Sequence, residues 1–437
     1  MFANRTNQDR IFQSFENKFI TLILGARRIG KTSLVNEYIK SHPAYRWVTL
    51  NMDDRAQREE VKKGKLKQLI EEAVLLRIGE NKKIWILIDE AQKCPSLFDQ
   101  IKMLYDQFKD KNSIKFILTG SGYLHLHQLS AETLAGRIEL FYLREFGLRE
   151  TLALNDNTII SGDLTLSILC ERSDLDHLEK QIKVMAPLRK ISTAAINTLL
   201  IYGGLPEVLE AKNDDARKRY LSGYLQTYLE KDVRDIQTID QLDLYQKLME
   251  IIAEQTGSVR QDQKLLEALG CNRETLKKYR GYLIATLMYQ EIYPFIGSPL
   301  KRVIKSPKGY LLNNGLTSYL TRLSDLEVLK KTGLIGHRFE NWFLNELLIW
   351  LDRDVELNRV SYWRTSAGVE VDFVVEKKPN VYPFEVTYSE KIQPKKLRNL
   401  KQFLHDEPKA SAGYYIYMGD YHYDNEARIF FIPAWAI

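Results

Sequence analysis

The sequence predicts a multidomain α/β protein, and its length, composition and pattern of apolar runs support this. The chain has 437 residues, of which 44% are hydrophobic and 27% charged, an ordinary globular composition. At roughly 100–200 residues per domain, this length allows two to four domains. In the first part of the chain, short β-branched apolar runs alternate with helical patterns. This alternation predicts a parallel sheet covered by helices on both faces.

Four segments of different texture define the expected domains. The first, residues 1–150, carries the alternating strands and helices, whereas residues 151–240 read as mostly helical. Residues 241–315 contain three short helical patterns followed by two strand-like runs. Residues 316–437 open with an amphipathic helix and continue with strands. The strands expected in the first segment are Phe19–Leu24, Trp47–Leu50, Ile84–Ile88 and Ile114–Leu118.

The strongest local signal lies at residues 25–32, which read Gly-Ala-Arg-Arg-Ile-Gly-Lys-Thr. Two glycines five positions apart, then Lys and Thr, form the P-loop pattern, and a strand precedes it while a helical pattern follows. Glycines let the backbone fold around phosphate, so that loop and helix N–H groups point inward. Lys31 should reach the β- and γ-phosphates of ATP, and Thr32 should hold Mg²⁺. The expected nucleotide-binding residues are Gly25, Arg28, Gly30, Lys31, Thr32 and Ser33.

Two carboxylates, Asp89 and Glu90, follow the apolar strand Ile84–Ile88 directly. Ligands bind at the carboxyl ends of strands in open α/β sheets. Asp89 is therefore the candidate for the Mg²⁺ shell, and Glu90 the candidate for orienting the attacking water. The alternative interpretation is an acidic strand end that is simply exposed to solvent.

Polar residues after the next expected strands are further candidates. Thr119 or Ser121, at the end of a neighbouring strand, can hydrogen-bond the γ-phosphate or the lytic water, unless they only cap a turn. Arg137 follows Leu134-Ala-Gly in the chain. An arginine here can contact the γ-phosphate of its own or a neighbouring subunit and stabilise transition-state charge. A surface arginine in an ion pair is the alternative.

Together with later motifs, these residues resemble a bacterial and archaeal family of AAA-type P-loop ATPases with a C-terminal domain of unknown function. The matching pieces, beyond those above, are Asp-Glu-Ala-Gln-Lys at 89–93, Gly203–Glu207, Tyr228–Val233, Lys305–Lys308, Glu370–Phe373 and Phe384–Val386. The resemblance covers nearly the whole chain apart from about 151–190. It implies a P-loop domain, a helical lid, a winged-helix module and a C-terminal domain similar to restriction-endonuclease-like, PD-(D/E)xK nucleases.

The middle segment is basic and has the texture of a winged helix. Helical patterns at 242–255, 262–269 and 273–286 precede the strand-like runs Tyr289–Ile296 and Val303–Leu312. Ten basic residues against four acidic ones between 257 and 310 give an excess equal to the net charge of +6 of the whole chain. Such a patch attracts phosphate backbones, and a third helix enters a major groove. A fold used only for protein contacts is the alternative. The expected contacts to double-stranded DNA are Arg273, Lys277, Lys278 and Arg280.

Acidic residues in the last segment suggest a second metal site. In the expected strand Val369–Val375, side chains alternate faces, so Asp372 can converge on Glu385 of the next strand if the two pair. Glu340, on the preceding helix Phe339–Leu351, can join them to hold Mg²⁺ and activate water. A polar-out strand pair is the simplest alternative.

The position that decides between an active and a degenerate nuclease is Thr387. Nucleases of this type usually carry a lysine two residues after the second acid, and here Lys391 is the nearby substitute. A degenerate domain that binds DNA or protein is therefore the favoured expectation.

The function expected from these features is Mg²⁺-dependent ATP hydrolysis coupled to DNA binding by the basic C-terminal half. A nucleotide-switched ATPase that binds a protein partner, and an ATP-gated nuclease, are the alternatives; further copies of the chain are also candidate partners. Cys94, Cys170 and Cys271 lie far apart, and few scattered cysteines fit a reducing compartment. With a polar start and no long apolar run, the sequence predicts a cytoplasmic protein without a membrane segment.

Overall fold

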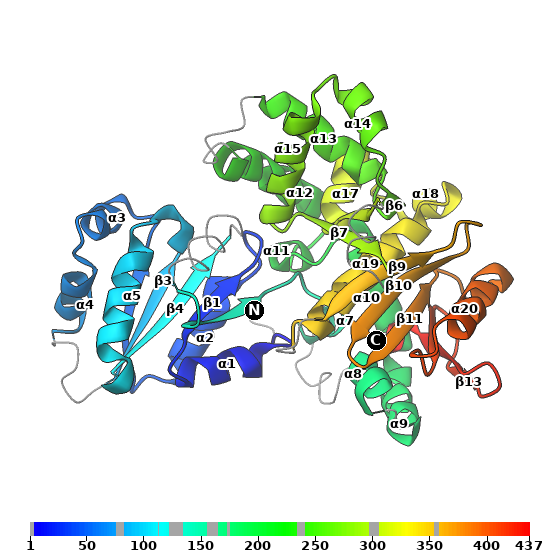
Figure 1. Ribbon diagram of the computed structural model, residues 1–437, viewed down its shortest axis with the longest axis horizontal. Coiled ribbons are helices and arrows are strands. Elements are labelled where there is room, and N and C mark those ends of the chain that lie inside the picture. Colours follow the sequence, from blue (N-terminus) through cyan, green and yellow to red (C-terminus); the bar gives the residue numbers. More distant parts are fainter. Residues whose placement is uncertain are drawn as a thin grey trace. The chain divides into compact units, whose positions relative to one another are not determined.

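The structure, a computed structural model, describes residues 4–75, 83–111, 113–121, 134–154, 165–172, 175–233, 241–296, 306–353 and 358–437. The chain divides into two compact units. The first comprises residues 1–144, blue to cyan in Figure 1, and the second comprises nearly all residues from 145 onward. No described helix has the length and apolar character needed to cross a lipid bilayer.

The first unit contains a five-stranded parallel sheet with the strand order β2-β3-β4-β1-β5. Four of these strands were predicted. The fifth, β5, was not, because this edge strand is mostly half-buried and lacks a continuous apolar run. The strands are β1 (Ile20–Leu24), β2 (Arg46–Asn51), β3 (Ile84–Asp89), β4 (Ile114–Gly120) and β5 (Ile138–Tyr142).

Helices cover both faces of this sheet (Figure 1). Alternate strand residues such as Ile23 and Leu87 pack in one core with α1 (Gln8–Glu16) and α2 (Lys31–Ser41). Their neighbours along the strands pack in a second core with the remaining helices. Burial on both faces accounts for the unbroken apolar strands. The second core is covered by α3 (Arg55–Lys62), α4 (Leu66–Val74) and α5 (Leu97–Phe108).

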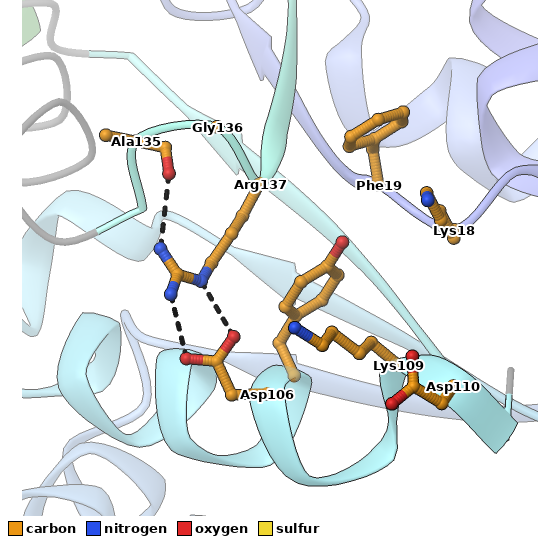
Figure 2. A pocket seen from close by; sticks show the side chains of 9 residues that line it. Lys18, Phe19, Asp106, Lys109, Asp110, Ala135, Gly136 and Arg137 are labelled. Carbon is orange, nitrogen blue, oxygen red and sulfur yellow. Dashed lines mark hydrogen bonds and ion pairs between the residues drawn. The ribbon is translucent and has the colours of Figure 1, made fainter.

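Parallel strands place the carboxyl ends of β1, β3 and β4 at one edge of the sheet and their starts at the other. Arg137 belongs to the second edge, because it directly precedes β5 and its carbonyl accepts a hydrogen bond of 2.8 Å from the N–H of Ile20 at the start of β1. Its guanidinium pairs with Asp106 of α5, as Figure 2 shows.

The second unit is built around a mixed nine-stranded sheet with the order β13-β14-β12-β11-β10-β9-β7-β8-β6. A parallel pairing of β7 with β9 joins the hairpin of the middle segment to the strands of the last one, so both segments share one sheet. The strands are β6 (Ser258–Val259), β7 (Tyr289–Pro294), β8 (Lys308–Leu311), β9 (Arg359–Arg364), β10 (Glu370–Lys377), β11 (Asn380–Val386), β12 (Gly413–Tyr417), β13 (His422–Asp424) and β14 (Ile429–Pro433).

The three helices expected in the middle segment are present as α13 (Leu242–Glu254), α14 (Asp262–Leu269) and α15 (Arg273–Ala285). Asn272 caps the third, accepting a hydrogen bond of 2.8 Å from the N–H of Thr275. The other helices are α7 (Leu148–Ala153), α8 (Thr165–Ser167), α9 (Leu175–Met185), α10 (Arg189–Tyr202), α11 (Pro206–Leu209), α12 (Asp214–Thr227), α17 (Asn314–Thr321), α18 (Leu326–Lys331), α19 (Ile335–Leu351) and α20 (Pro394–Asp406).

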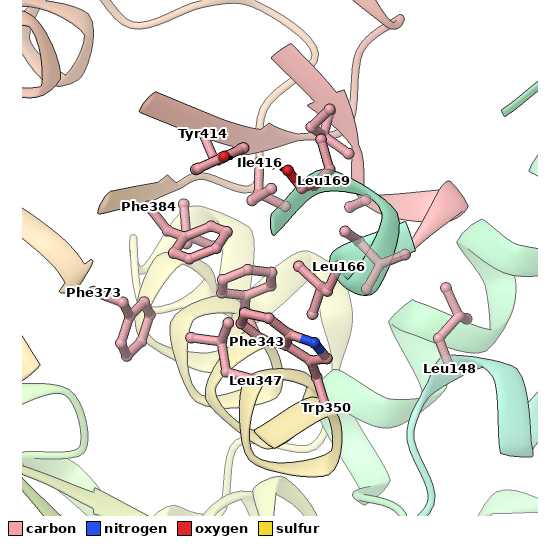
Figure 3. Packing of buried hydrophobic residues seen from close by; sticks show 14 of the residues in the cluster. Leu148, Leu166, Leu169, Phe343, Leu347, Trp350, Phe373, Phe384, Tyr414 and Ile416 are labelled. Atoms are coloured by element: carbon pink, nitrogen blue, oxygen red, sulfur yellow. Dashed lines mark hydrogen bonds between the residues drawn. The ribbon is translucent and has the colours of Figure 1, made fainter. Parts of the chain in front are cut away.

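Described residues of the segment around 151–190, which the family resemblance does not cover, pack into the core of the second unit. Leu166 and Leu169 lie against Phe343 and Trp350 of α19, together with aromatic residues of the sheet (Figure 3). The hydroxyl of Tyr382 on β11 donates a hydrogen bond of 2.6 Å to the carbonyl of Cys170. These residues therefore belong to the second unit, and a lid role for 151–240 stays a prediction.

A buried glutamate makes the stability of the second unit depend on pH. Glu346 of α19 is 8% exposed, and its Oε1 accepts a hydrogen bond of 2.7 Å from the N–H of Leu148. Burial, with a smaller contribution from the Glu150 carboxylate, raises its pKa to about 8. The folded unit thus holds a proton that the unfolded chain releases near the ordinary value of 4.5. Its stabilisation is complete below that pH and is lost as the pH rises toward 8.

We therefore expect Glu346→Gln to flatten the decline in stability between about pH 4.5 and pH 8. At pH 8 the variant should be more stable than the wild type by on the order of 4–5 kcal/mol, because the pKa moves from 4.5 to about 8 and each unit of pKa shift corresponds to about 1.4 kcal/mol. Urea unfolding of both proteins across this pH range measures the difference, and the exposed Glu327→Gln serves as the control. Parallel pH profiles for Glu346→Gln and the wild type would contradict the assignment.

Candidate functional site

The loop between β1 and α2 has a backbone suited to an anion. Gly30 has a φ of +92° and Arg28 a φ of +56°, both in the left-handed region. Non-glycine residues rarely adopt this backbone conformation, and those that do often lie at functional sites. Gly25 also needs to be glycine, since a Cβ there would lie 2.5 Å from the carbonyl oxygen of Leu143. The first N–H groups of α2 have no intrahelical acceptor, so they are available to a phosphate.

Lys31 lies at the start of α2, at the mouth of this loop. Its side chain is nearly buried, and its ammonium donates hydrogen bonds of 2.9 Å to the carbonyls of Gly25 and Ala26. The charge is therefore held against the loop that would wrap the phosphates. Phosphate oxygens are stronger acceptors for an ammonium than neutral carbonyls. Ser33, the third residue of α2, is exposed.

Asp89 meets the loop from the end of β3. The hydroxyl of Thr32 donates a hydrogen bond of 2.9 Å to its Oδ2, and the hydroxyl of Thr119 donates to its Oδ1. The N–H of Glu90 adds a hydrogen bond of 3.1 Å to Oδ1. Two motifs that are 57 residues apart thus place a hydroxyl and a carboxylate oxygen together. Both are ligand types that Mg²⁺ binds.

Glu90 is held by a second set of polar groups. Its φ of +53° lies in the left-handed region. Its Oε2 accepts hydrogen bonds of 2.6 Å from the amide of Gln92 and 3.3 Å from the hydroxyl of Ser121. The Gln92 amide also donates to Ser121 Oγ, at 2.9 Å. Sequence reasoning left the choice between Thr119 and Ser121 open, and in the structure Thr119 contacts Asp89 whereas Ser121 contacts Glu90.

Gln92 is the residue in this group that sequence reasoning did not single out. It stands in the Asp-Glu-Ala-Gln-Lys motif, on a 3₁₀ turn that covers Ala91–Lys93. This turn brings its side chain back over Glu90. The sequence offered one signal for Gln92, its position two residues after Glu90. That spacing brings the two side chains together only because the 3₁₀ turn folds the chain back.

Arg137 does not join this group within one chain. It lies at the opposite edge of the sheet, where Nε and Nη2 donate hydrogen bonds of 2.9 Å to the two oxygens of Asp106. This pairing lowers the pKa of Asp106. A cavity of about 390 Å³ opens beside the pair and is lined by Lys18, Tyr105 and Lys109 among others (Figure 2). The geometry therefore excludes contact with nucleotide on the same chain, and a contact with a neighbouring subunit stays a prediction.

The basic face of α15 is smaller than expected, because Arg280 is buried. Its Nη1 donates a hydrogen bond of 2.8 Å to Asp262, and its Nε lies 3.2 Å from Glu291. Four residues after the buried Leu276, it faces the core side of the helix. The expectation that Arg280 contacts DNA is therefore corrected. Arg273 and Lys277 are exposed, and Lys278 is half-buried.

Other basic residues of the middle segment are also neutralised. Arg260 pairs with Asp262 and Glu291, and Lys308 is buried in an ion pair with Glu370. Lys301, Arg302 and Lys305 lie outside the described residues. Among the described residues of α14 and α15, the exposed basic residues are Lys264, Arg273 and Lys277, and Lys278 is half-buried.

Asp372 and Glu385 converge as expected, and a lysine that sequence reasoning missed lies between them. The ammonium of Lys396, in the first turn of α20, donates to Asp372 Oδ2, to Glu385 Oε2 at 3.0 Å and to the carbonyl of Val386 at 2.9 Å. The N–H of Val386 also donates to Asp372 Oδ2, at 2.8 Å. The contact depends on how α20 packs against the sheet, which no local pattern reveals.

Neither of the two positions considered from the sequence, Thr387 and Lys391, takes the role that Lys396 has between the acids. Thr387 is buried, and its hydroxyl accepts a hydrogen bond of 2.9 Å from Gln393. Lys391 is exposed. The described lysine that contacts both acids is Lys396, eleven residues after Glu385.

Glu340 lies near this group but does not complete a metal site with it. Its Oε2 is 4.0 Å from the ammonium of Lys308. Burial, with the charge of Asp372 next in size, raises the pKa of Glu340 to about 7. Over the residues that the structure describes, no three or more His, Cys, Asp or Glu side chains are placed to hold a metal ion. The expected site of Glu340, Asp372 and Glu385 is therefore not formed by these three carboxylates alone.

Three family models match successive parts of the chain. Residues 17–152 match an AAA domain. Residues 193–327 match a domain of unknown function, DUF8612, and residues 335–437 match another, DUF4143. The first match covers the sheet and both edges described above.

Two curated relatives are similar over almost the full chain. They are uncharacterized proteins of Mycobacterium tuberculosis and Mycobacterium bovis, each 23% identical over 434 residues, covering 99% of this chain and 84% of the relative.

Solved structures show a more distant likeness. The ORC1 protein of Aeropyrum pernix in complex with DNA is 12% identical, with 79% of this chain and 95% of that chain covered and a TM-score of 0.30. DnaA from Aquifex aeolicus is 14% identical, with 63% and 88% covered and a TM-score of 0.27. Scores this low carry no inference about function.

Proposed function

We propose that the first unit binds ATP with Mg²⁺ and hydrolyses it, and that nucleotide state controls DNA binding by the second unit. The observation that carries the proposal is the hydrogen bond between Thr32 and Asp89, which joins the phosphate-binding loop to the acidic end of β3. The match of residues 17–152 to an AAA domain supports the same assignment.

Each residue of the site has a distinct role in this proposal. Lys31 and the N–H groups of the loop bind the β- and γ-phosphates, and Thr32 with Asp89 holds Mg²⁺, which offsets charge on the phosphates. Glu90 orients the attacking water and accepts its proton, since its carboxylate is positioned by Gln92 and Ser121.

The DNA-binding part of the proposal depends on α15. Three helices followed by a hairpin match the winged-helix order, and the third helix carries Arg273 and Lys277 on its exposed face. Such residues contact phosphates and add affinity without sequence preference.

The test is the ATP turnover of the full chain with and without duplex DNA, with Mg²⁺ and at moderate salt, with the DNA examined for cleavage in the same tube. We expect turnover to rise with DNA while the DNA stays intact. Unchanged turnover, together with no DNA binding at that salt, would rule out the coupling.

The double variant Arg273→Ala/Lys277→Ala isolates the contribution of α15. If both side chains neutralise phosphates, the slope of log affinity against log salt should become shallower by about two, since each contact contributes about 0.9. Fluorescence anisotropy with a labelled duplex measures the slope. Lys247→Ala, which removes an exposed lysine from α13, is the control. An unchanged slope in the double variant would place the DNA surface elsewhere.

A protein partner is the second candidate for the second unit. It is favoured by the loss of Arg260, Arg280 and Lys308 from the basic surface, since all three are neutralised by carboxylates. This alternative predicts that the assembly state changes with ATP and is indifferent to DNA. Light scattering with and without nucleotide tests it, and an assembly state that ignores nucleotide would exclude it.

A further inference from the structure

We propose that the cavity beside the Arg137–Asp106 ion pair binds a small ligand that carries one carboxylate group and an apolar ring. The cavity has a volume of about 390 Å³ and lies where β1 and β5 begin, next to the C-terminal end of α5. Binding sites for small molecules typically measure roughly 300–1,000 Å³. This cavity lies at the sheet edge opposite the loop before α2, so the proposal does not depend on ATP binding.

One wall of the cavity is held in place by Arg137. Its Nε and Nη2 donate hydrogen bonds of 2.9 Å to the two oxygens of Asp106 on α5, and its Nη1 donates one of 3.2 Å to the carbonyl of Ala135 (Figure 2). The turn at Ala135 and Gly136 is closed by a hydrogen bond of 2.9 Å from the N–H of Arg137, and Gly136 has a φ of +72°, which favours glycine. The guanidinium therefore ties this turn to the helix.

A second wall, at Phe19, is held from inside the unit. The N–H of Phe19 donates a hydrogen bond of 2.9 Å to Asn17 Oδ1, and its carbonyl accepts one from the ammonium of the buried Lys115. The ammonium of Lys18 lies 5.6 Å from the centroid of the Phe19 ring, so this charge is placed at the cavity wall. Because both walls are preorganised, a ligand would lose little affinity to the ordering of the protein.

The charges around the cavity match one negative charge on a ligand. Arg137 and Asp106 neutralise each other. The remaining charged residues of the cavity wall are Lys18, Lys109 and Asp110, all of them exposed (Figure 2). Neither lysine is in an ion pair with a carboxylate among the residues that the structure describes. Two ammonium groups against one carboxylate leave an excess of one positive charge, which a carboxylate on the ligand would offset.

A carboxylate suits this cavity better than a phosphate. Tyr105 and Asp106 belong to the last turn of α5, which ends at Phe108, and the C-terminal end of a helix repels anions. The carboxylates of Asp106 and Asp110 add to this repulsion, which grows with the charge of the ligand. Arginine is the side chain best suited to bidentate binding of phosphate, and here the guanidinium is already paired with Asp106. A singly charged ligand is therefore favoured over a phosphate or a nucleic acid.

Two aromatic side chains supply the apolar part of the cavity. Phe19 is half-buried, and Tyr105 is 6% exposed and also lines the cavity. Aromatic rings pack favourably against another ring in offset or edge-to-face arrangements. Burial raises the pKa of Tyr105, so its hydroxyl stays protonated and can donate a hydrogen bond to a carboxylate. The cavity thus combines ring surfaces with a donor and two ammonium groups.

A matched pair of probes tests the proposal on the wild-type full chain. N-acetyl-phenylalanine and its amide share the ring and differ in the negative charge, and ligand-observed NMR titration measures the affinity of each. We expect the acid to bind about fivefold or more tightly than the amide, a factor that corresponds to about 1 kcal/mol, as for a favourable exposed ion pair. Equal affinities, or no binding of either probe at millimolar concentration, would overturn the proposal.

Variants and labelling locate the carboxylate. Lys18→Ala/Lys109→Ala should lower the affinity for the acid to that for the amide, whereas Lys40→Ala, which removes an exposed lysine of α2, should not. Lys31→Ala should also keep the affinity, because Lys31 lies at the other edge of the sheet. In the wild type, the acid should slow acylation of Lys18 and Lys109, but not of Lys40, as read by mass spectrometry. Unchanged affinity in the double variant, loss of affinity in Lys31→Ala, or no protection of the two lysines would overturn the proposal.

Discussion

Replacing Lys31 with alanine is expected to abolish ATP turnover, with a loss of roughly 100-fold or more, as for the removal of a preorganised electrostatic contact. The ammonium is nearly buried and sits within 2.9 Å of two loop carbonyls, so it is the charge closest to where the loop would hold a phosphate. Without it, the site loses the ammonium group that would contact the β- and γ-phosphates directly. Nucleotide affinity and steady-state hydrolysis measure the effect.

The control for this substitution is Lys40→Ala, on the same helix. Lys40 is exposed and pairs weakly with Glu37, so its loss changes the charge of α2 by the same amount without touching the loop. We expect its turnover to match the wild type. If Lys31→Ala hydrolyses ATP normally, the assignment of the loop is wrong.

Glu90→Gln is expected to separate binding from hydrolysis. A glutamine has the same size and can still accept a hydrogen bond from the Gln92 amide, so the site should keep its shape and its affinity for ATP with Mg²⁺. It cannot accept a proton from the attacking water, and general-base catalysis contributes typically 100-fold or more. Turnover should therefore fall by roughly 100-fold, with little change in nucleotide affinity.

Glu37→Gln provides the matching control, because Glu37 is a half-exposed carboxylate on α2 that forms a weak pair with the exposed Lys40. Its turnover should be unaffected. If the Glu90→Gln protein hydrolyses ATP at the wild-type rate, Glu90 takes no part in the hydrolysis, and Asp89 becomes the candidate acid.

The geometry of the proposed nucleotide site was largely predictable from sequence, because its parts are contiguous motifs at strand ends. A parallel sheet brings the ends of β1, β3 and β4 to one edge, so Asp89 and Thr119 meet beside the loop that follows β1. Gln92 was not predicted, because its contact with Glu90 depends on a turn and not on the strand pattern.

The parts that sequence did not reveal depend on contacts between distant segments. Lys396 reaches Asp372 only because α20 packs over β10 and β11, and Arg280 is neutralised by residues on another helix and a strand. A count of charges along the sequence assumes that these basic residues are exposed, whereas the fold buries them in ion pairs. Neither ion pair produces a periodic pattern in the sequence that could have predicted it.

The organisation of the second unit was also beyond the sequence pattern. The β7–β8 hairpin of the middle segment and the strands of the last segment form one sheet through the pairing of β7 with β9. Apolar runs predict that a strand exists, but they do not identify the strand that pairs with it. The same holds for 165–172, whose apolar residues fill the core against α19.

The central claim is that Thr32 and Asp89 place Mg²⁺ beside a nucleotide held by the loop before α2. Isothermal titration of the full chain with a slowly hydrolysed ATP analogue, in Mg²⁺ and again in excess EDTA, tests it most directly. We predict saturable binding of one nucleotide per chain in Mg²⁺ and much weaker binding in EDTA. Absence of binding in Mg²⁺, or equal affinity in both buffers, would contradict the claim.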